Sequence, residues 1–177
     1  VDDIQGNQGD DVILGGFAGD LIQGDAGNDV ILGDNGDIFY AGGLVTRMIS
    51  TDRSNATGGD DVINGYFGDG VDCGDQDIED NDLIIAGVGR DTVNANLGDD
   101  VVIADNGEID FNVPGVDTDP LSIDLIQSTD LMLGDADVVN AGEGDDIVIG
   151  GFGADVLHGE VGSDLIFGDN GRVDLVA

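Results

Sequence analysis

A nine-residue unit that recurs in phase along most of the chain is the feature that constrains its fold most. Each unit opens on glycine-rich residues, carries Asp at its sixth position and closes on a short apolar stretch, as in residues 24–32. Sixth-position Asp residues recur nine apart at Asp2, Asp11, Asp20 and Asp29, at Asp82, Asp91 and Asp100, and at Asp137, Asp146, Asp155 and Asp164. Asp61 starts a similar unit, but Gly70 stands where the next Asp is expected. A short internal period of this kind is typical of solenoids, in which each unit packs on its neighbours.

The unit combines a strand signal with a turn signal. Its three final residues suit a short β-strand, and its glycines and Asp suit a tight turn. Two units then make an 18-residue coil with two strands and two turns. The sequence therefore predicts an all-β chain in which successive coils stack into two parallel sheets, a β-roll. The eighth-position residues are expected to point inward: Ile13, Ile22, Ile31, Ile84, Val93, Val102, Val148, Leu157 and Ile166.

Stacking places equivalent Asp residues one above the other. The expected pairs are Asp2 with Asp20, Asp11 with Asp29, Asp82 with Asp100, Asp137 with Asp155, and Asp146 with Asp164. Carboxylates this close repel each other unless they take up protons or hold a cation. Two carboxylates and several turn carbonyls supply the oxygen ligands that Ca²⁺ prefers, whereas Mg²⁺ demands a strict octahedron and Zn²⁺ favours Cys and His.

Several calcium ions are therefore predicted, with ligands from two sets of residues. The carboxylate ligands are Asp2, Asp11, Asp20, Asp29, Asp61, Asp82, Asp91, Asp100, Asp137, Asp146, Asp155 and Asp164. The glycine ligands are Gly15, Gly24, Gly33, Gly150, Gly159 and Gly168. In this register Asp146 faces an ion, and its neighbour Asp145 faces solvent.

Charge excludes several classes of partner. The 177 residues contain 39 acidic and 4 basic residues, for a net charge of −35. Such a chain lacks the basic face that binding to nucleic acid or to an anionic membrane requires. Its apolar runs last only a few residues, too short to insert across a membrane. The apolar fraction of 40% also separates it from acidic disordered tails, and the lone Cys73 permits no internal disulfide.

A second, longer period divides the chain. Asp-Asn-Gly closes each cluster of units, at residues 34–36, 105–107 and 169–171, and the nine-residue rhythm then stops. We expect β-roll segments at 1–36, 58–107 and 132–171, hairpin insertions at 37–57 and 108–131, and the start of a further insertion at 172–177. Within the second segment, residues 65–81 break the phase and are expected to form an irregular loop of unassigned register. The chain is interpreted as a piece of a longer array.

The ninth position alternates between apolar and polar residues. It is apolar at Leu14, Leu32, Ile85, Ile103, Ile149 and Phe167, and polar at Gln5, Gln23, Asn94, Asn140 and His158. One sheet is therefore apolar on both faces, and we expect the hairpins to cover it. These hairpins are predicted from residues 38–40 and 44–50 and from residues 109–113 and 121–127. The alternative is that the alternation reflects ordinary strand preference.

The ends of the clusters carry an expectation of their own. The sixth positions that follow Asp-Asn-Gly hold Ile38, Ile109 and Val173, which cannot ligate Ca²⁺. Asp20, Asp91 and Asp155 therefore have no Asp partner 18 residues further on. We expect each run of ions to stop at these three residues.

The unit resembles the repeats-in-toxin (RTX) nonapeptide, Gly-Gly-x-Gly-x-Asp-x-aliphatic-x. Residues 150–158 match every fixed position, whereas Asp25, Ala95-Asn96 and Glu160 depart at the first or second glycine, and Ala18 departs at the fourth position. The resemblance implies a calcium-bound parallel β-roll from a large secreted bacterial protein. It also implies type I export and folding in the calcium outside the cell.

We interpret the chain as a calcium-binding structural module and not as an enzyme. His158 has no signalled catalytic partner and is expected on the solvated surface, and Asp119-Pro120 is expected to be a turn. The expected partners are calcium ions and neighbouring repeats of the same longer chain. Two alternatives stay open: a ligand-binding segment of an adhesin, and the folding and secretion tail of an extracellular enzyme.

Overall fold

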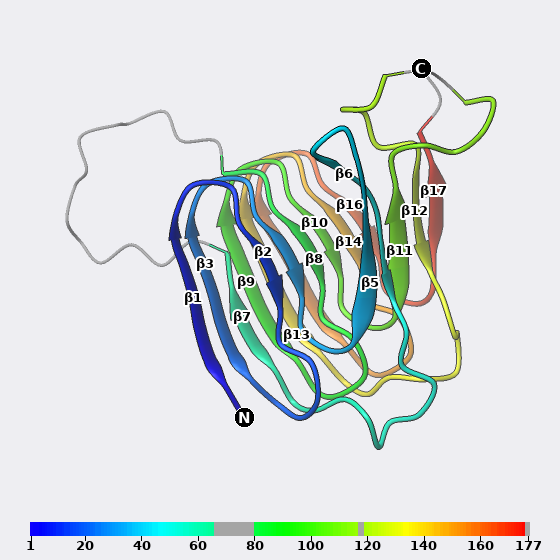
Figure 1. Ribbon diagram of the computed structural model, residues 1–177. Coiled ribbons are helices and arrows are strands. Elements are labelled where there is room, and N and C mark those ends of the chain that lie inside the picture. The colour runs from blue at the N-terminus through cyan, green and yellow to red at the C-terminus, as the bar shows by residue number, and fades with distance from the viewer. Residues whose placement is uncertain (66–79, 117–118, 176–177) are drawn as a thin grey trace.

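The structure, a computed structural model, describes residues 1–65, 80–116 and 119–175, and its elements are β-strands in three layers (Figure 1). The outer sheet contains β1 (Asp3–Gln8), β3 (Leu21–Ala26), β7 (Val62–Asn64), β9 (Thr92–Leu97), β13 (Val138–Glu143) and β15 (Val156–Val161), in that order. The middle sheet contains β2 (Val12–Leu14), β4 (Val30–Leu32), β8 (Leu83–Ile85), β10 (Val101–Ile103), β14 (Ile147–Ile149) and β16 (Leu165–Phe167). The cover sheet contains β5 (Gly36–Ala41), β6 (Leu44–Ser50), β11 (Gly107–Asp110), β12 (Leu125–Ser128) and β17 (Arg172–Asp174).

The outer and middle sheets form a β-roll, as predicted. All their strand pairs are parallel, and units 18 residues apart lie side by side, with Ile4 opposite Ile22 and Ile13 opposite Ile31. The roll also continues past the first insertion, because β3 pairs with β7 and β4 pairs with β8. The three roll segments are therefore parts of one uninterrupted solenoid.

A thin core lies between the outer and middle sheets. It consists of Ile13, Ile22, Ile31, Ile63, Ile84, Ala86, Val93, Ala95, Val102, Ala104, Val139, Ala141 and Val148. Seven of these are eighth-position residues named from the sequence. The other two that were named lie in the last coil, where Leu157 is half-buried and Ile166 is 42% exposed. Stacked small and medium aliphatic side chains thus fill the space between the two sheets.

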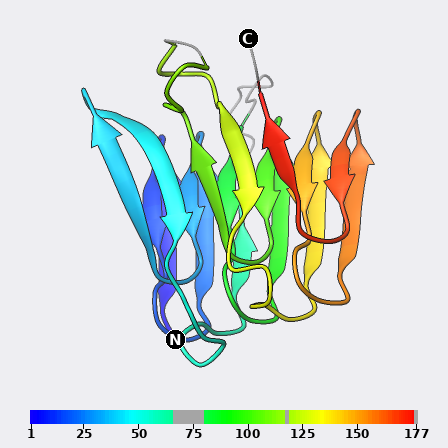
Figure 2. The same ribbon diagram turned by 90° about the vertical axis from the view of Figure 1, so that its right-hand side faces the viewer.

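A second core lies between the middle sheet and the cover sheet. Leu32, Ile85, Ile103 and Ile149 pack there in one cluster with Met48, Ile109 and Ile126. Figure 2 shows the antiparallel cover strands lying over one face of the roll as a separate layer. The interior strands β4, β8, β10 and β14 of the middle sheet are buried on both faces, which explains their continuous aliphatic sequences.

The prediction of a covered face is confirmed for most of the middle sheet, but it is wrong for one residue. Leu32 is 1% exposed and Ile149 is fully buried, whereas Leu14 is 42% exposed. Leu14 belongs to β2, the edge strand of the middle sheet. The cover therefore protects the interior strands and leaves this edge open.

The glycine of Asp-Asn-Gly has a different role from the one its sequence suggests. Asn-Gly is a strong turn signal, but Gly36 and Gly107 begin strands β5 and β11 without a positive φ. A Cβ on Gly107 would lie 2.5 Å from Ile103, and one on Gly171 would lie 3.0 Å from Phe167. A Cβ on Gly36 would likewise collide with Leu32. The missing side chain thus lets each cover strand pass close to the roll strand that precedes it.

The turns keep their geometry where glycine is replaced. Ala18, Asp25, Asn96 and Glu160 all have φ between 68° and 84°, a region that L-residues rarely adopt. Three of them lie within six-residue strands of the outer sheet, which extend past the three residues expected from the sequence. Parallel pairing with a neighbouring strand holds these three in the left-handed conformation, with Asp25 opposite Asn7 and both Asn96 and Glu160 opposite Gly142.

The region that breaks the phase, 65–81, lies for the most part outside the described residues, which resume at Asp80. The first hairpin forms where it was predicted, and β5 and β6 meet at Gly42 and Gly43. In the described part of the chain, no helix has the length and apolarity needed to cross a membrane.

Candidate metal centre

The twelve Asp residues named from the sequence form two ladders, one along each edge of the roll. The first ladder contains Asp2, Asp20, Asp61, Asp91, Asp137 and Asp155. The second ladder contains Asp11, Asp29, Asp82, Asp100, Asp146 and Asp164. Each Asp directly precedes a strand of the roll, so the parallel pairing of the strands brings the side chains into line.

A repeated hydrogen bond joins the members of each ladder. The backbone N–H of each Asp donates to Oδ1 of the next Asp, and the ten N···O distances lie between 2.5 and 3.2 Å. All five pairs expected at a spacing of 18 residues are among them. One oxygen of each accepting carboxylate is therefore used by the fold itself.

The ladders do not stop at the insertions. Asp20 donates to Asp61, 41 residues away, and Asp91 donates to Asp137, 46 residues away. The ladder therefore continues past Asp20 and Asp91, so the reason for expecting the runs of calcium ions to end at these residues was wrong. It counted residues along the chain, whereas each insertion leaves the roll and returns to the next coil. Asp155 is the last member of the first ladder in the described residues.

The second oxygen is left without a partner in most ladder residues. Oδ2 is buried and accepts no hydrogen bond in Asp11, Asp20, Asp29, Asp61, Asp82, Asp91, Asp100, Asp137, Asp146 and Asp155. Burying a polar atom without a partner is costly, and the cost is larger for a charged one. Two rows of such atoms point to protons or cations along both edges of the roll.

Five of the six predicted glycines lie against Oδ2 of a ladder Asp, and four of those five oxygens are buried without a partner. A Cβ on Gly15 would lie 3.0 Å from Asp20 Oδ2, and one on Gly150 would lie 2.8 Å from Asp155 Oδ2. A Cβ on Gly24, Gly33 or Gly159 would collide with Oδ2 of Asp29, Asp61 or Asp164, respectively. Gly168 instead has open space around it. Their role as carbonyl ligands stays a prediction, and the carbonyl of Gly33 also accepts a hydrogen bond from Gly16 N–H at 2.9 Å.

Burial raises the pKa of the central ladder residues, and neighbouring carboxylates raise it further. The pKa rises from 3.8 to about 6 in Asp29, about 7 in Asp61, about 8 in Asp82 and Asp137, and about 9 in Asp91 and Asp100. Hydrogen bonds from backbone amides lower the pKa in each case but do not offset the burial. At neutral pH the centre of each ladder therefore holds protons or requires positive charge nearby.

The donor set fits a hard cation. In the described ranges, no three side chains of Asp, Glu, His or Cys converge closely enough to form a metal site on their own. An ion at a ladder would therefore meet stacked Asp carboxylates and complete its shell with turn carbonyls. Ca²⁺ accepts six to eight oxygen ligands in flexible geometry, so this combination suits it.

Comparison with known protein families decides what these turns are. A family model described as the RTX calcium-binding nonapeptide repeat (4 copies) matches residues 1–18, 5–37, 50–69, 78–108 and 140–172, which is more than half of the chain. The chain belongs to this family. Repeats of this family bind calcium and form β-rolls. The Asp ladders agree with the first property, and the stacked parallel sheets agree with the second. Neither a curated protein nor a solved structure matches the chain.

Two buried carboxylates beside the RTX ladders were missed by the sequence analysis. Asp34 and Asp105, the first residues of two Asp-Asn-Gly motifs, are each 1% exposed. Burial raises the pKa of both to about 8, aided by the nearby carboxylates of Asp61 and Asp155, respectively. Their common signal was the motif itself, which was interpreted only as the end of each cluster of units.

A third row of side chains lies outside the second RTX ladder. The fifth-position residues Asp10, Asn28, Asn81, Asp99 and Asp145 each accept a hydrogen bond from the backbone N–H of the equivalent residue in the next coil. Asp145 is exposed and Asp146 is 1% exposed, so the expected difference in their exposure is confirmed. The exposed row reinforces the same turns from the solvent side.

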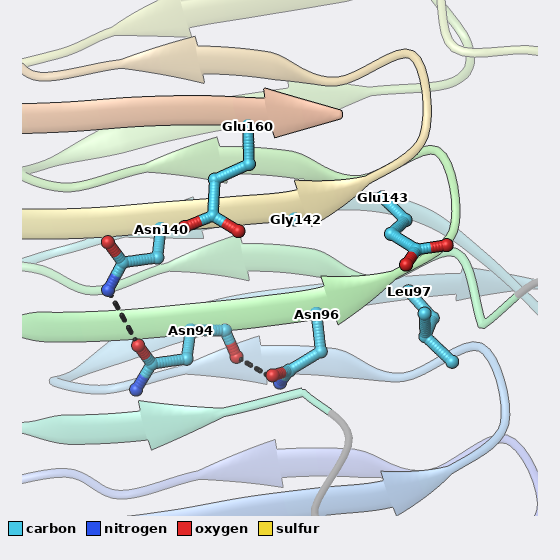
Figure 3. Close-up of a pocket in the computed structure, with 7 residues that line it drawn as sticks. All are labelled: Asn94, Asn96, Leu97, Asn140, Gly142, Glu143 and Glu160. Carbon is cyan, nitrogen blue, oxygen red and sulfur yellow. Dashed lines mark hydrogen bonds between the residues drawn. The ribbon is translucent and has the colours of Figure 1, made fainter. Parts of the chain in front are cut away.

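The open face of the outer sheet carries an amide ladder and a pocket (Figure 3). Asn140 Nδ2 donates to Asn94 Oδ1 at 2.8 Å, and Asn94 Nδ2 donates to Asn64 Oδ1 at 2.9 Å. His158 is exposed, as predicted, and its Nδ1 lies 3.0 Å from Asn140 Oδ1. The pocket is lined by Asn94, Asn96, Leu97, Asn140, Gly142, Glu143 and Glu160. No ladder Asp lines it, so it is separate from the candidate metal centre.

Proposed function

We propose that this chain is a calcium-binding structural module of a secreted RTX protein, and that it folds when calcium binds outside the cell. The observation that carries the proposal is the double row of buried Oδ2 atoms without hydrogen-bond partners. Calcium ions between stacked carboxylates would neutralise these atoms and join one coil to the next.

The charge of the chain supports coupling between calcium and folding. A net charge of −35 on 177 residues disfavours the compact state through self-repulsion. The ladders concentrate part of that charge at buried positions, which raises the cost of folding without a counterion. Ions that bind the folded state and not the unfolded chain stabilise the folded state by mass action. The unfolded chain is thus suited to an environment poor in calcium, and the folded chain to the exterior of a bacterial cell.

We further propose that the module has a structural and not a catalytic role. Its buried carboxylates lie in regular hydrogen-bonded rows that resemble one another, and regular repetition serves stacking. Calcium ions and further repeats of the same longer chain are the proposed partners, since coils of this kind stack on equivalent coils.

Circular dichroism during a calcium titration tests the proposal. In excess chelator the chain is expected to be expanded and to lack β signal, and roughly millimolar Ca²⁺ is expected to restore that signal. Mg²⁺ at the same concentration is the control and is expected to leave the spectrum unchanged. A full β spectrum in excess chelator at neutral pH would contradict the proposal.

A further inference from the structure

Both insertions leave the same edge of the roll, and they leave it between two residues of the first ladder. The first separates β4, which ends at Leu32, from β7, which begins at Val62. The second separates β10 from β13. The first ladder nevertheless keeps its spacing, with Asp20 N–H to Asp61 Oδ1 at 2.7 Å and Asp91 N–H to Asp137 Oδ1 at 2.8 Å. Some contact must hold the departing and returning chain in register at each insertion.

At the first insertion the carboxylate of Asp34 makes contacts of this kind. Asp34 is the second residue after β4, where the chain leaves the roll. Its Oδ1 accepts the N–H of Gly59, in the returning chain, at 3.2 Å. Its Oδ2 accepts the N–H of Val88, in the turn of the next coil, at 2.7 Å. One buried side chain thus joins the exit, the return and the following coil.

Asp105 occupies the equivalent place at the second insertion. It is the second residue after β10, and its Oδ2 accepts the N–H of Phe152 in the turn of the next coil. The returning chain approaches the other oxygen, Oδ1, through Gly134, whose Cβ would collide with it, and this buried oxygen accepts no hydrogen bond. The same three parts of the fold meet at Asp105 as at Asp34, although 71 residues separate the two.

Glycines on two sides leave room for each carboxylate. A Cβ on Gly87, in the next coil, would lie 2.5 Å from Asp34 Oδ2, and one on Gly58, in the returning chain, would collide with the same atom. Gly151 and Gly134 hold the corresponding positions around Asp105, and a Cβ on either would collide with its carboxylate. The two insertions therefore share the same arrangement of one Asp and two glycines.

We propose that Asp34 and Asp105 are positioning residues that keep the first ladder continuous across the insertions. Each carboxylate accepts a hydrogen bond from the turn of the next coil and packs against a glycine of the returning chain, and so fixes Asp61 or Asp137 above the preceding coil. This inference rests on the proposed function only in that calcium is expected along the ladder. Asp34 and Asp105 are not themselves proposed to be calcium ligands.

The variants Asp34→Asn and Asp105→Asn test the proposal, with Asp169→Asn as the matched control. Asn places an NH₂ group against amide donors, so one accepted hydrogen bond is lost. Asp169 begins the third Asp-Asn-Gly but is exposed. Backbone amide exchange is measured residue by residue by NMR at saturating calcium. We expect Asp34→Asn to speed exchange about tenfold or more at Val88, whose N–H donates to Asp34, and at Asp20, whose N–H donates to Asp61 in the first ladder. Exchange at Asp29, in the second ladder, is expected to stay unchanged.

Calcium stoichiometry gives the second readout, by titration calorimetry. Asp34→Asn and Asp105→Asn are expected to bind fewer ions with wild-type affinity, whereas Asp169→Asn is expected to match the wild type. Equal acceleration of exchange at Asp20 and Asp29 would show general destabilisation and overturn the proposal, as would unchanged exchange in both variants. Gly58→Ala is the second variant if Asn abolishes folding, because Gly58 has an ordinary φ and its Cβ would collide with Asp34 Oδ2 and with the Val88 carbonyl, which disturbs the same joint without changing the carboxylate. If the wild type folded without binding calcium, the proposed function would fail, and the exchange comparison would still test the positioning role.

Discussion

The backbone N–H of Asp20 donates to Oδ1 of Asp61 at 2.7 Å, although 41 residues separate the two in sequence. Between them the chain leaves the roll, forms the β5–β6 hairpin and returns to the neighbouring coil. The same bond joins Asp2 to Asp20, which are 18 residues apart with no insertion between them. The geometry of the ladder is therefore independent of the length of chain between its members, and a calcium row is expected to run along the whole edge.

The neighbours Asp145 and Asp146 provide a matched test of the ligand assignment. Asp146→Asn keeps an oxygen that can accept the N–H of Asp100 but removes the charge. We expect it to raise the calcium midpoint of folding about tenfold or more, because a buried ligand carboxylate is lost. Asp145→Asn makes the same chemical change at an exposed side chain and is expected to shift the midpoint less than twofold. Equal shifts in a calcium titration followed by circular dichroism would refute the assignment.

Leu32 and Leu14 test the cover, since they occupy the same position of neighbouring coils. Leu32→Asp at saturating calcium is expected to lower the unfolding free energy by about 1.5–3 kcal/mol because apolar burial is lost. Burying the new carboxylate is expected to lower the unfolding free energy further. It is also expected to expose the β5–β6 hairpin to protease. Leu14→Asp, at a residue that is 42% exposed, is expected to cost about 0.5 kcal/mol or less. Urea unfolding and limited proteolysis measure both effects, and an unchanged hairpin in Leu32→Asp would mean that the face is open.

Gly24 and Gly168 differ in what a side chain would meet. A Cβ on Gly24 would collide with the carboxylate of Asp29, whereas one on Gly168 would meet nothing within 4 Å. Gly24→Ala is expected to destabilise the calcium-bound state by about 1–3 kcal/mol, the usual cost of overpacking, and to weaken calcium binding accordingly. Gly168→Ala is expected to behave as the wild type. The measurement is thermal unfolding at several calcium concentrations, and the prediction fails if both variants unfold alike.

The raised pKa values predict how pH acts on the ladders. In the metal-free folded chain, Asp61, Asp82, Asp91, Asp100 and Asp137 have pKa values of about 7 to 9, against 3.8 as the ordinary value. The folded state then binds more protons than the unfolded state between pH of about 4 and about 9. The metal-free unfolding free energy is therefore expected to be highest below pH of about 4 and to fall as pH rises through that window.

Calcium binding should show the opposite dependence on pH, because calcium displaces these protons. The calcium midpoint is expected to fall about tenfold per pH unit for each proton released, between pH of about 6 and about 9. Titrations in buffers of matched ionic strength measure it. A midpoint independent of pH across this range would show that the ladder carboxylates do not exchange protons for calcium.

Much of the fold could be predicted from the sequence because the repeat is local. Each nine-residue unit carries its own turn and strand, and equivalent units necessarily stack, so Ile22 and Ile31 could be placed in the core. The alternation at the ninth position also predicted which sheet needs a cover, as the burial of Leu32 confirms. The exposure of Leu14 could not be predicted, because it depends on where the cover strands lie and not on any property of its own unit.

The candidate site was predictable in its members but not in its connections. All twelve ladder Asp residues follow from the sixth position of the repeat, since each one directly precedes a strand. The partners of Asp20, Asp29, Asp61, Asp91 and Asp100 could not be assigned, because insertions or the break in phase change the spacing to 41, 53, 30, 46 and 46 residues. Counting by 18 failed there because strand pairing is set by neighbouring coils in space.

The sequence of this protein therefore specifies the repeating unit, its strands and turns, and the identity of its carboxylates, since all of these arise within nine residues. The continuity of the roll, the second core beneath the cover sheet and the roles of Asp34 and Asp105 depend on contacts between segments far apart in sequence. The Asp-Asn-Gly motif shows the difference: its letters indicate a turn, but in the fold Asp34 joins two coils and Gly36 clears space for Leu32. Long-range packing assigned those roles, because burial and close approach exist only once the coils are stacked.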